Sequence, residues 1–107
     1  MKGKRQATGD NVMSHLAGLR SGMTAEERAA YDERSLAIRT VLELVEQRKK
    51  RRLAQRTIAD RMGVSQPVIA RLEKPLESSW RQPSLSVLSR YAAALGLVLE
   101  VRLRPAA

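Results

Sequence analysis

The chain contains no cysteine and no phenylalanine. The absence of cysteine excludes disulfides, a thiol nucleophile and the sulfur-rich zinc sites, and it fits a reducing compartment. No apolar run approaches the roughly 18 residues needed to span a bilayer. The N-terminal region also lacks the apolar stretch of a secretory signal. We therefore expect a protein that does not contact a membrane and stays in the cytoplasm.

Aromatic residues contribute only 3% of the 107 residues, so aliphatic side chains supply nearly all of the apolar content. Leucine, isoleucine, valine, alanine and methionine suit small packed helices. A chain of this length buries only a modest core, which makes its stability marginal. We expect one all-α domain, with association between copies as a further source of stability.

Groups for catalysis are equally scarce. His15 is the single histidine and lies in a polar region near the N-terminus, where we expect it to be a bystander. The sequence contains no Ser/His/Asp set, no glycine-rich phosphate loop and no clustered metal ligands. It therefore predicts a protein that is not an enzyme and that uses neither a cofactor nor a metal.

Positive charge is abundant and unevenly placed. The chain has 20 basic and 11 acidic residues, which gives a net charge of +9. Residues 47–56 contain six arginines and lysines and no acid. A block of this kind attracts DNA phosphates through counterion release. Solvated helix ends and surfaces for acidic partners have the same composition, so charge alone leaves these alternatives open.

The N-terminal half predicts a tail followed by a long helix. Residues 1–23 combine glycine with polar and basic residues and are expected to form a flexible basic tail. Thr24 and Glu27 have the spacing of a capping box, which indicates the start of a helix. That helix can continue toward Arg51, and a break near residues 32–35 is the alternative for so long an element.

The C-terminal part predicts a loop, a helix and a strand. A polar loop over residues 77–83 precedes a helix that runs from a cap at Ser84 to Gly96. Residues 97–104 then alternate with a period of two, which is typical of a strand. A single strand needs a partner, so we expect the same strand of a second subunit to pair with it in a homodimer. The alternatives are a strand that packs along its own domain and a frayed tail that continues the preceding helix. The dimer interface would contain Leu97, Leu99, Val101 and Leu103.

Residues 53–73, LAQRTIADRMGVSQPVIARLE, predict two short amphipathic helices joined at Gly63. Apolar residues repeat with helical spacing on both sides of this glycine, which permits the positive φ of a sharp turn. Ala59 is small, as required where two helices cross closely. Such a pair in a basic chain indicates a helix-turn-helix that reads the major groove of DNA.

This segment resembles the helix-turn-helix of the Cro/cI, or XRE, family of repressors, whose pattern is roughly LTQxxLAxxxGVSQxxISxxE. The likeness extends through residues 83–96 and implies a lambda-repressor-like five-helix domain over residues 24–96. The helix-turn-helix itself would occupy residues 55–73 of this domain, which would begin with an extended N-terminal helix and be followed by the C-terminal β-strand. Double-stranded DNA with a pseudopalindromic operator is the implied partner, which also implies association with the nucleoid. The outright matches are Leu53, Gln55, Ala59, Gly63, Val64, Ser65, Gln66, Ile69 and Glu73.

The resemblance also assigns the DNA contacts. Gln66 offers a donor and an acceptor that suit adenine N6 and N7, and Arg71 can reach guanine or a phosphate. Val68 suits a thymine methyl group. Gln55 resembles the family glutamine that contacts the DNA backbone and braces the first reading residue. The complete expected DNA-binding set is Gln55, Arg56, Ser65, Gln66, Pro67, Val68, Arg71, Lys74 and Arg81.

Arg48 and Glu73 resemble the family pair that joins the basic helix end to the residue after the recognition helix. We expect them to form a structural ion pair. The chain departs from the family pattern elsewhere. Arg52 stands where glycine is frequent, and Pro67 occupies a position that often holds a polar base-reading side chain. Trp80 lies in a loop extension, where it would clamp phosphates or anchor the loop to the core.

The overall size, the N-terminal helix and the closing residues resemble antitoxins of HigA type from type II toxin–antitoxin modules. This resemblance implies autorepression of an operon and neutralisation of a ribonuclease toxin. The alternatives are a stand-alone or phage-type repressor without a toxin, and a protein-interaction module with non-specific affinity for nucleic acid. A helix face that only packs on its own core is the alternative to a toxin contact. The expected toxin contacts are Glu26, Glu27, Tyr31 and Leu36.

Overall fold

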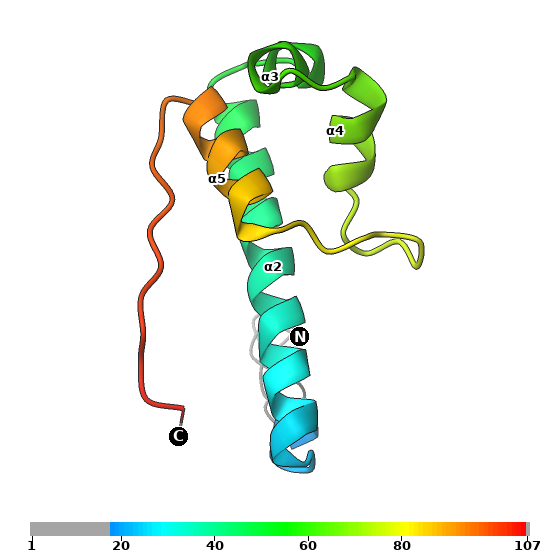
Figure 1. The fold of residues 1–107 in the computed structure, drawn as a ribbon, viewed down its shortest axis with the longest axis vertical. Coiled ribbons are helices and arrows are strands. Elements are labelled where there is room, and N and C mark those ends of the chain that lie inside the picture. Colours follow the sequence, from blue (N-terminus) through cyan, green and yellow to red (C-terminus); the bar gives the residue numbers. More distant parts are fainter. Residues whose placement is uncertain (1–17, 107) are drawn as a thin grey trace, which may run out of the picture. The chain divides into compact units, whose positions relative to one another are not determined.

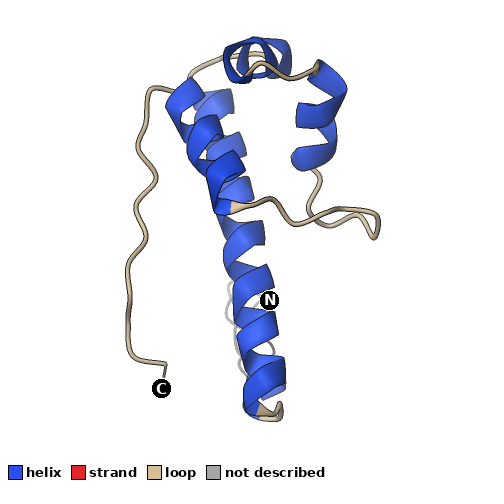
Figure 2. Ribbon diagram, in the orientation of Figure 1, coloured by secondary structure: helices blue, strands red, loops and turns tan. Residues whose placement is uncertain are grey.

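The computed structural model describes residues 18–106, so the greater part of the predicted tail, with His15, lies outside the described residues. A helical turn at residues 18–21 precedes four helices (Figure 1). These are α2 over Ala25–Lys50, α3 over Gln55–Met62, α4 over Gln66–Leu72 and α5 over Leu85–Ala94. The described residues contain no strand, which confirms the all-α class (Figure 2). The chain divides into two compact units, residues 1–35 and 36–107.

In the first unit, the start of α2 is fixed by a reciprocal cap. The backbone N–H of Thr24 donates to Glu27 Oε1 at 2.8 Å, and the Glu27 N–H donates to Thr24 Oγ1 at 3.1 Å. These are the two hydrogen bonds of a capping box. Arg20 also donates to both carboxylate oxygens of Asp32, each at 2.8 Å. The helix shows no break at residues 32–35.

Two residues after the end of α2, the backbone adopts left-handed geometry. Arg52 has φ 55°, a conformation that an L residue adopts at a cost of about 1–2 kcal/mol. The Leu53 N–H donates to the carbonyl of Arg48 at 3.1 Å, which closes the final turn. Arg52 therefore occupies the left-handed position after the helix C-terminus, where glycine is the usual residue.

The second unit contains the core and the predicted helix-turn-helix. Helix α3 packs against α4 and α5. Gly63 has φ 70°, the left-handed geometry that ends α3 and directs the chain into α4. Ser84 caps α5 by accepting from the Val87 N–H at 3.2 Å. The largest fully buried side chains, drawn from all four helices, are Val41, Ile58, Ile69 and Tyr91.

The loop between α4 and α5 is anchored by Trp80. Its side chain is 8% exposed, and its indole N–H donates to the carbonyl of Leu72 at 2.9 Å. That bond satisfies a donor that burial would otherwise leave without a partner. Of the two roles expected for this residue, the structure shows the anchor.

The C-terminal β-strand is a wrong prediction. Gly96, with φ 77°, ends the last helical turn, and the following residues are extended without belonging to a sheet. Leu97 and Leu99 pack against the core of their own unit, which accounts for the alternation without a hydrogen-bonded ladder. A strand also requires backbone donors and acceptors on a neighbouring segment. The single chain supplies no such segment within residues 18–106.

Candidate nucleic-acid interface

The start of α4 presents an exposed polar end. Ser65 holds the N-cap position with φ −81° and ψ 155°, but its hydroxyl makes no capping hydrogen bond. Its carbonyl accepts from the Val68 N–H at 3.1 Å instead. Pro67 lies in the first turn, where its missing N–H costs no helical hydrogen bond. Ser65, Gln66 and Pro67 are all exposed, so this end of the helix is accessible to a macromolecule.

The expected base-reading residues share this accessible end and the following turn. Val68 is 40% exposed, and Arg71 and Lys74 are exposed as well. Arg56 lies exposed on α3, and Arg81 lies exposed on the loop after α4. The side chains expected to contact DNA are therefore on the surface, except for Gln55, which is partly buried.

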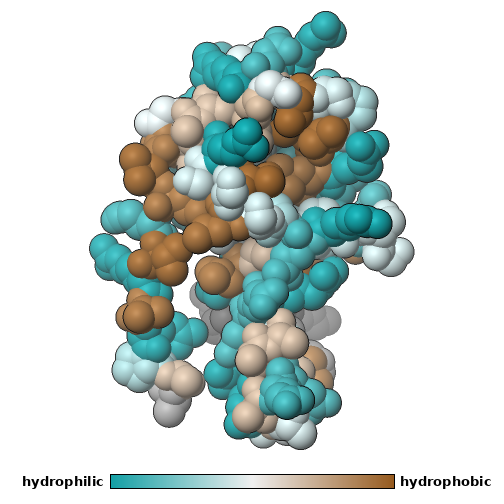
Figure 3. Space-filling model, viewed as in Figure 1, coloured by the Kyte–Doolittle hydropathy of each residue, from teal (hydrophilic) through white to brown (hydrophobic). Residues whose placement is uncertain are grey.

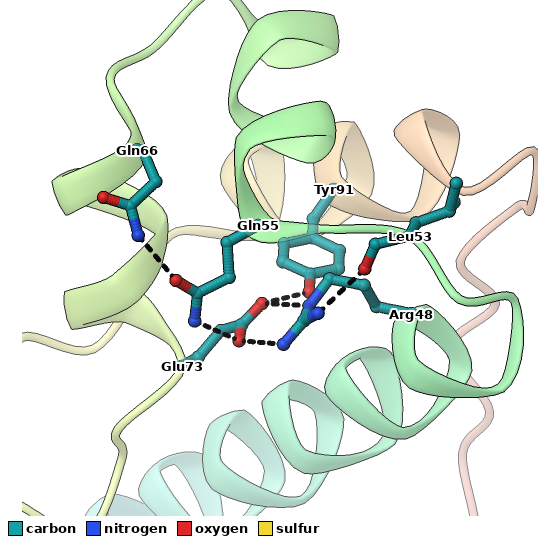
Figure 4. Close-up of polar contacts among 6 residues, drawn as sticks. All are labelled: Arg48, Leu53, Gln55, Gln66, Glu73 and Tyr91. Atoms are coloured by element: carbon teal, nitrogen blue, oxygen red, sulfur yellow. Dashed lines mark hydrogen bonds and ion pairs between the residues drawn. The ribbon is translucent and has the colours of Figure 1, made fainter.

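Gln55 and Gln66 are joined directly. The Gln66 Nε2 donates to Gln55 Oε1 at 2.7 Å, so the first residue of α3 holds the first residue of α4 (Figure 4). The Gln55 Nε2 in turn donates to Glu73 Oε1 at 2.9 Å. The exposed reading glutamine is thus connected to a carboxylate in the interior of the unit.

Glu73 lies at the C-terminal end of α4 and receives donors from the three other helices (Figure 4). Arg48 contacts it bidentately, with Nη2 to Oε1 at 2.7 Å and Nε to Oε2 at 2.8 Å. The Tyr91 hydroxyl donates to Oε2 at 2.5 Å. Arg48 also donates through Nη1 to the carbonyl of Leu53 at 2.9 Å. The expected pair of Arg48 and Glu73 is therefore present, within a larger network.

Burial and hydrogen bonding shift the pKa values of this network. Burial alone raises the pKa of Glu73, but hydrogen bonds from Arg48, Tyr91 and Gln55 outweigh it and lower that pKa below 4.5. The hydrogen bond to Glu73 raises the pKa of Arg48, against the effect of burial. Burial and the nearby carboxylate raise the pKa of the Tyr91 hydroxyl. At neutral pH the carboxylate is therefore ionised, and the phenol keeps its proton.

An open groove of about 510 Å³ runs beside α4. Its lining includes Val68 and Arg71 from α4, Trp80 and Arg81 from the loop, and Arg90 from α5. Apolar side chains therefore line a groove that also carries several cations. A surface of this sign favours phosphate groups.

Sequence reasoning assigned no role to Tyr91. Its signal was present, because a tyrosine interrupts an otherwise aliphatic helix face and a buried hydroxyl needs a hydrogen-bond partner. The sequence does not predict which residue is that partner, since Glu73 lies 18 positions earlier in the chain.

The expected dimer residues divide into two kinds. Leu97 and Leu99 are partly buried against their own core. Val101 and Leu103 are 61% and 98% exposed. Figure 3 shows apolar surface along this extended segment, which descends on the left of the view. The outer half of the segment therefore presents apolar side chains to solvent.

The expected toxin contacts lie on α2. Glu26 is exposed, and Glu27 uses its carboxylate to cap the helix. Tyr31 is partly buried. These three residues belong to the first unit, and Leu36, which is 51% exposed, belongs to the second.

The described residues include neither a helix that could span a membrane nor a cluster of metal ligands. None of the described helices combines the length and apolarity of a membrane span. Within residues 18–106 there is also no group of three or more histidine, cysteine, aspartate or glutamate side chains placed to hold a metal ion.

Comparison with known proteins gives one match. A family model described as Helix-turn-helix (HTH_3), of the Cro/cI type, matches residues 44–100, more than half of the chain. The matched span includes α3, α4 and α5. It also includes Glu73 and the three residues that donate to its carboxylate. No curated protein and no solved structure matches the chain.

Proposed function

As the chain belongs to the Cro/cI-type family of helix-turn-helix transcription regulators, we propose that it is a repressor that reads a specific DNA sequence with α4. The observation that carries this proposal is the exposed amide of Gln66, held by Gln55 at the accessible end of α4. A glutamine held in this way can bond both N6 and N7 of adenine. Nearby cations such as Arg71 supply the affinity for the DNA backbone.

The test begins with selection of binding sites from a synthetic duplex library. About 20 randomised base pairs accommodate two half-sites one helical turn apart. Gln66→Ala and Arg71→Ala are expected to weaken binding to the selected duplex by roughly 1–3 kcal/mol each and to relax base preference at separate positions. Arg39→Ala, which removes an exposed arginine from α2, is the control and should change neither. Unchanged base preference in both variants would refute the proposal.

We propose further that the repressor is a homodimer that associates through residues 97–104. An antiparallel alignment with Val101 opposite Val101 of a second copy puts Glu100 opposite Arg102 of that copy. The same alignment places the exposed Val101 side chains of the two copies against each other, so the charged and the apolar positions at its centre are complementary. Alignments centred on Glu100 or Arg102 place like charges opposite each other. This alignment is supported by the exposure of Val101 and Leu103 in the single chain.

Sedimentation at micromolar concentration tests the dimer. Val101→Ser combined with Leu103→Ser should give monomers that bind a single half-site. Val98→Ser is the matched control, because Val98 is 87% exposed but lies on the other side of the alternation. A wild-type monomer at these concentrations, or equal behaviour of the two variants, would exclude this interface.

An antitoxin role is a narrower proposal. It is supported by Leu36, an apolar side chain that is 51% exposed on α2, together with the exposed carboxylate of Glu26. Co-expression with the product of the adjacent reading frame should give a complex in which mRNA cleavage is suppressed, and Leu36→Glu should weaken it. Operator binding without any such complex would favour a stand-alone repressor. Salt-dependent binding to DNA without base preference would favour the other alternative, a protein-interaction module with non-specific affinity for nucleic acid.

A further inference from the structure

The Glu73 carboxylate uses all of its acceptor positions inside the protein. Oε1 accepts from Arg48 Nη2 and Gln55 Nε2, and Oε2 accepts from Arg48 Nε and the Tyr91 hydroxyl. An ionised carboxylate offers about four lone-pair positions and no donor. Its side chain is only 5% exposed, so water does not replace a lost donor easily. Each of the four donors therefore helps to fix where the two oxygens lie.

The carboxylate also determines which way two amides face. Because Glu73 only accepts, Gln55 must direct its NH₂ group inward, and its oxygen then faces Gln66. Gln66 must therefore donate to that oxygen through Nε2, at 2.7 Å. The remaining groups of Gln66 are its oxygen and one N–H. This set matches adenine, which offers a donor at N6 and an acceptor at N7, whereas guanine offers two acceptors.

We propose that the Tyr91 hydroxyl is a positioning residue for base reading, because it holds the carboxylate that orients Gln55 and Gln66. The inference rests on the proposed function, in which Gln66 reads a base. Tyr91 is 1% exposed, and its ring packs in the core while its hydroxyl reaches Glu73. Loss of the hydroxyl leaves Oε2 with Arg48 as its one remaining donor, so the carboxylate is held less firmly and the hydrogen bond that orients Gln55 is weakened. The Tyr91 hydroxyl thereby influences specificity from the core, without itself contacting DNA.

Tyr91→Phe tests the proposal because it removes the hydroxyl and keeps the ring. Tyr31→Phe is the matched control, since Tyr31 lies on α2 and the donors to the Glu73 carboxylate are Arg48, Gln55 and Tyr91. The probe is the duplex selected by the wild-type protein from the randomised library. In a second duplex, guanine replaces adenine at one position. This is the position at which the Gln66→Ala variant no longer prefers a particular base. The measured quantity is the ratio of the two dissociation constants.

The wild-type ratio is expected to be roughly 10- to 100-fold in favour of adenine. Tyr91→Phe should reduce it at least about fivefold and leave the preference at the position read by Arg71 unchanged. The dependence of binding on salt should also stay the same, because phosphate contacts carry no base information. Tyr31→Phe should leave the ratio intact. A merely structural role for the hydroxyl predicts equal weakening for both duplexes, and that result would overturn the proposal.

A double-mutant cycle separates the relay from other effects. Gln55→Met breaks the connection between Glu73 and Gln66, so adding Tyr91→Phe to it should lower the ratio no further. Additive losses would mean that the hydroxyl acts by another route. If Gln66→Ala changes base preference at no position, the proposed function itself is wrong. That outcome is distinct from a result in which Gln66 reads a base but Tyr91→Phe leaves the ratio unchanged.

Nuclear magnetic resonance of the unmodified protein gives a check that does not depend on a variant folding. A buried hydroxyl proton that is donated to an ionised carboxylate exchanges slowly with water. The Tyr91 hydroxyl should therefore give a resolved proton signal at neutral pH. Rapid exchange of this proton would contradict the geometry on which the inference depends.

Discussion

Removal of Arg48 is expected to destabilise the protein strongly. An exposed ion pair contributes about 0–1 kcal/mol, whereas breaking a buried one costs about 3–5 kcal/mol. The side chains of Arg48 and Glu73 are 11% and 5% exposed, which places the pair near the buried limit. Tyr91 and Gln55 still donate to the carboxylate when Arg48 is gone, so the loss falls toward the lower end of that range. We expect Arg48→Met to lower the free energy of unfolding by about 3 kcal/mol.

The assay is urea unfolding followed by circular dichroism, with thermal unfolding as a second measurement. Each kcal/mol corresponds to roughly 4–8 °C in Tm for a domain of this size. The double variant Arg48→Met with Glu73→Met should recover part of the loss, because it leaves no uncompensated charge but removes the acceptor of the Tyr91 hydroxyl and of the Gln55 amide. Arg39→Met, at an exposed position of α2, is the control and should change stability by less than about 0.5 kcal/mol. A loss below about 1 kcal/mol for Arg48→Met would show that the pair behaves as a surface pair and would refute the reasoning.

Three further predictions follow from the same structure. Folding lowers the pKa of Glu73, so its contribution to stability is complete above about pH 4.5 and is lost as the pH falls through its pKa in the folded protein. Urea unfolding from pH 3 to 7 should show this loss of stability at low pH, and Glu73→Gln should make the stability less dependent on pH. Ser84→Ala should cost about 1 kcal/mol because Ser84 caps α5, whereas Ser65→Ala should cost clearly less in the same unfolding assay because its hydroxyl caps nothing; equal losses would contradict the cap assignments. Trp80→Phe leaves the Leu72 carbonyl without its indole donor and should cost about 1–3 kcal/mol, whereas a thermal unfolding curve like that of the wild type would show that the loop does not depend on this anchor.

Helix boundaries were predictable because their signals are local. The capping box at Thr24 and Glu27, the turn at Gly63 and the cap at Ser84 each involve residues close together in the chain. A periodicity of apolar residues near 3.6 likewise reports a helix face without reference to the rest of the fold. The order and the approximate ends of α2 to α5 therefore follow from the sequence.

Long-range pairing was not predictable by the same means. Alternation over residues 97–104 is a local pattern, but a strand is defined by bonds to a neighbour, and Leu97 and Leu99 instead pack on their own core. The partner of the Tyr91 hydroxyl depends on how α5 lies against the end of α4. Ser65 occupies a cap position without making the capping bond that its residue type favours. For Leu97, Leu99 and Tyr91, tertiary geometry selects among options that local chemistry allows.

The network around Glu73 makes base reading and folding partly separable. Arg48 carries most of the charge compensation, so its removal should act first on stability. The Tyr91 hydroxyl adds one hydrogen bond to an ionised carboxylate, with a net contribution to stability of about 1.5–3 kcal/mol, and that bond helps to orient the amides that face a base. In a DNA-binding domain whose base-reading amides are oriented by one buried carboxylate, a small change in another helix can therefore alter base preference while the fold persists. Tyr91→Phe should accordingly alter base preference more than Arg48→Met does, and Arg48→Met should have the larger effect on stability.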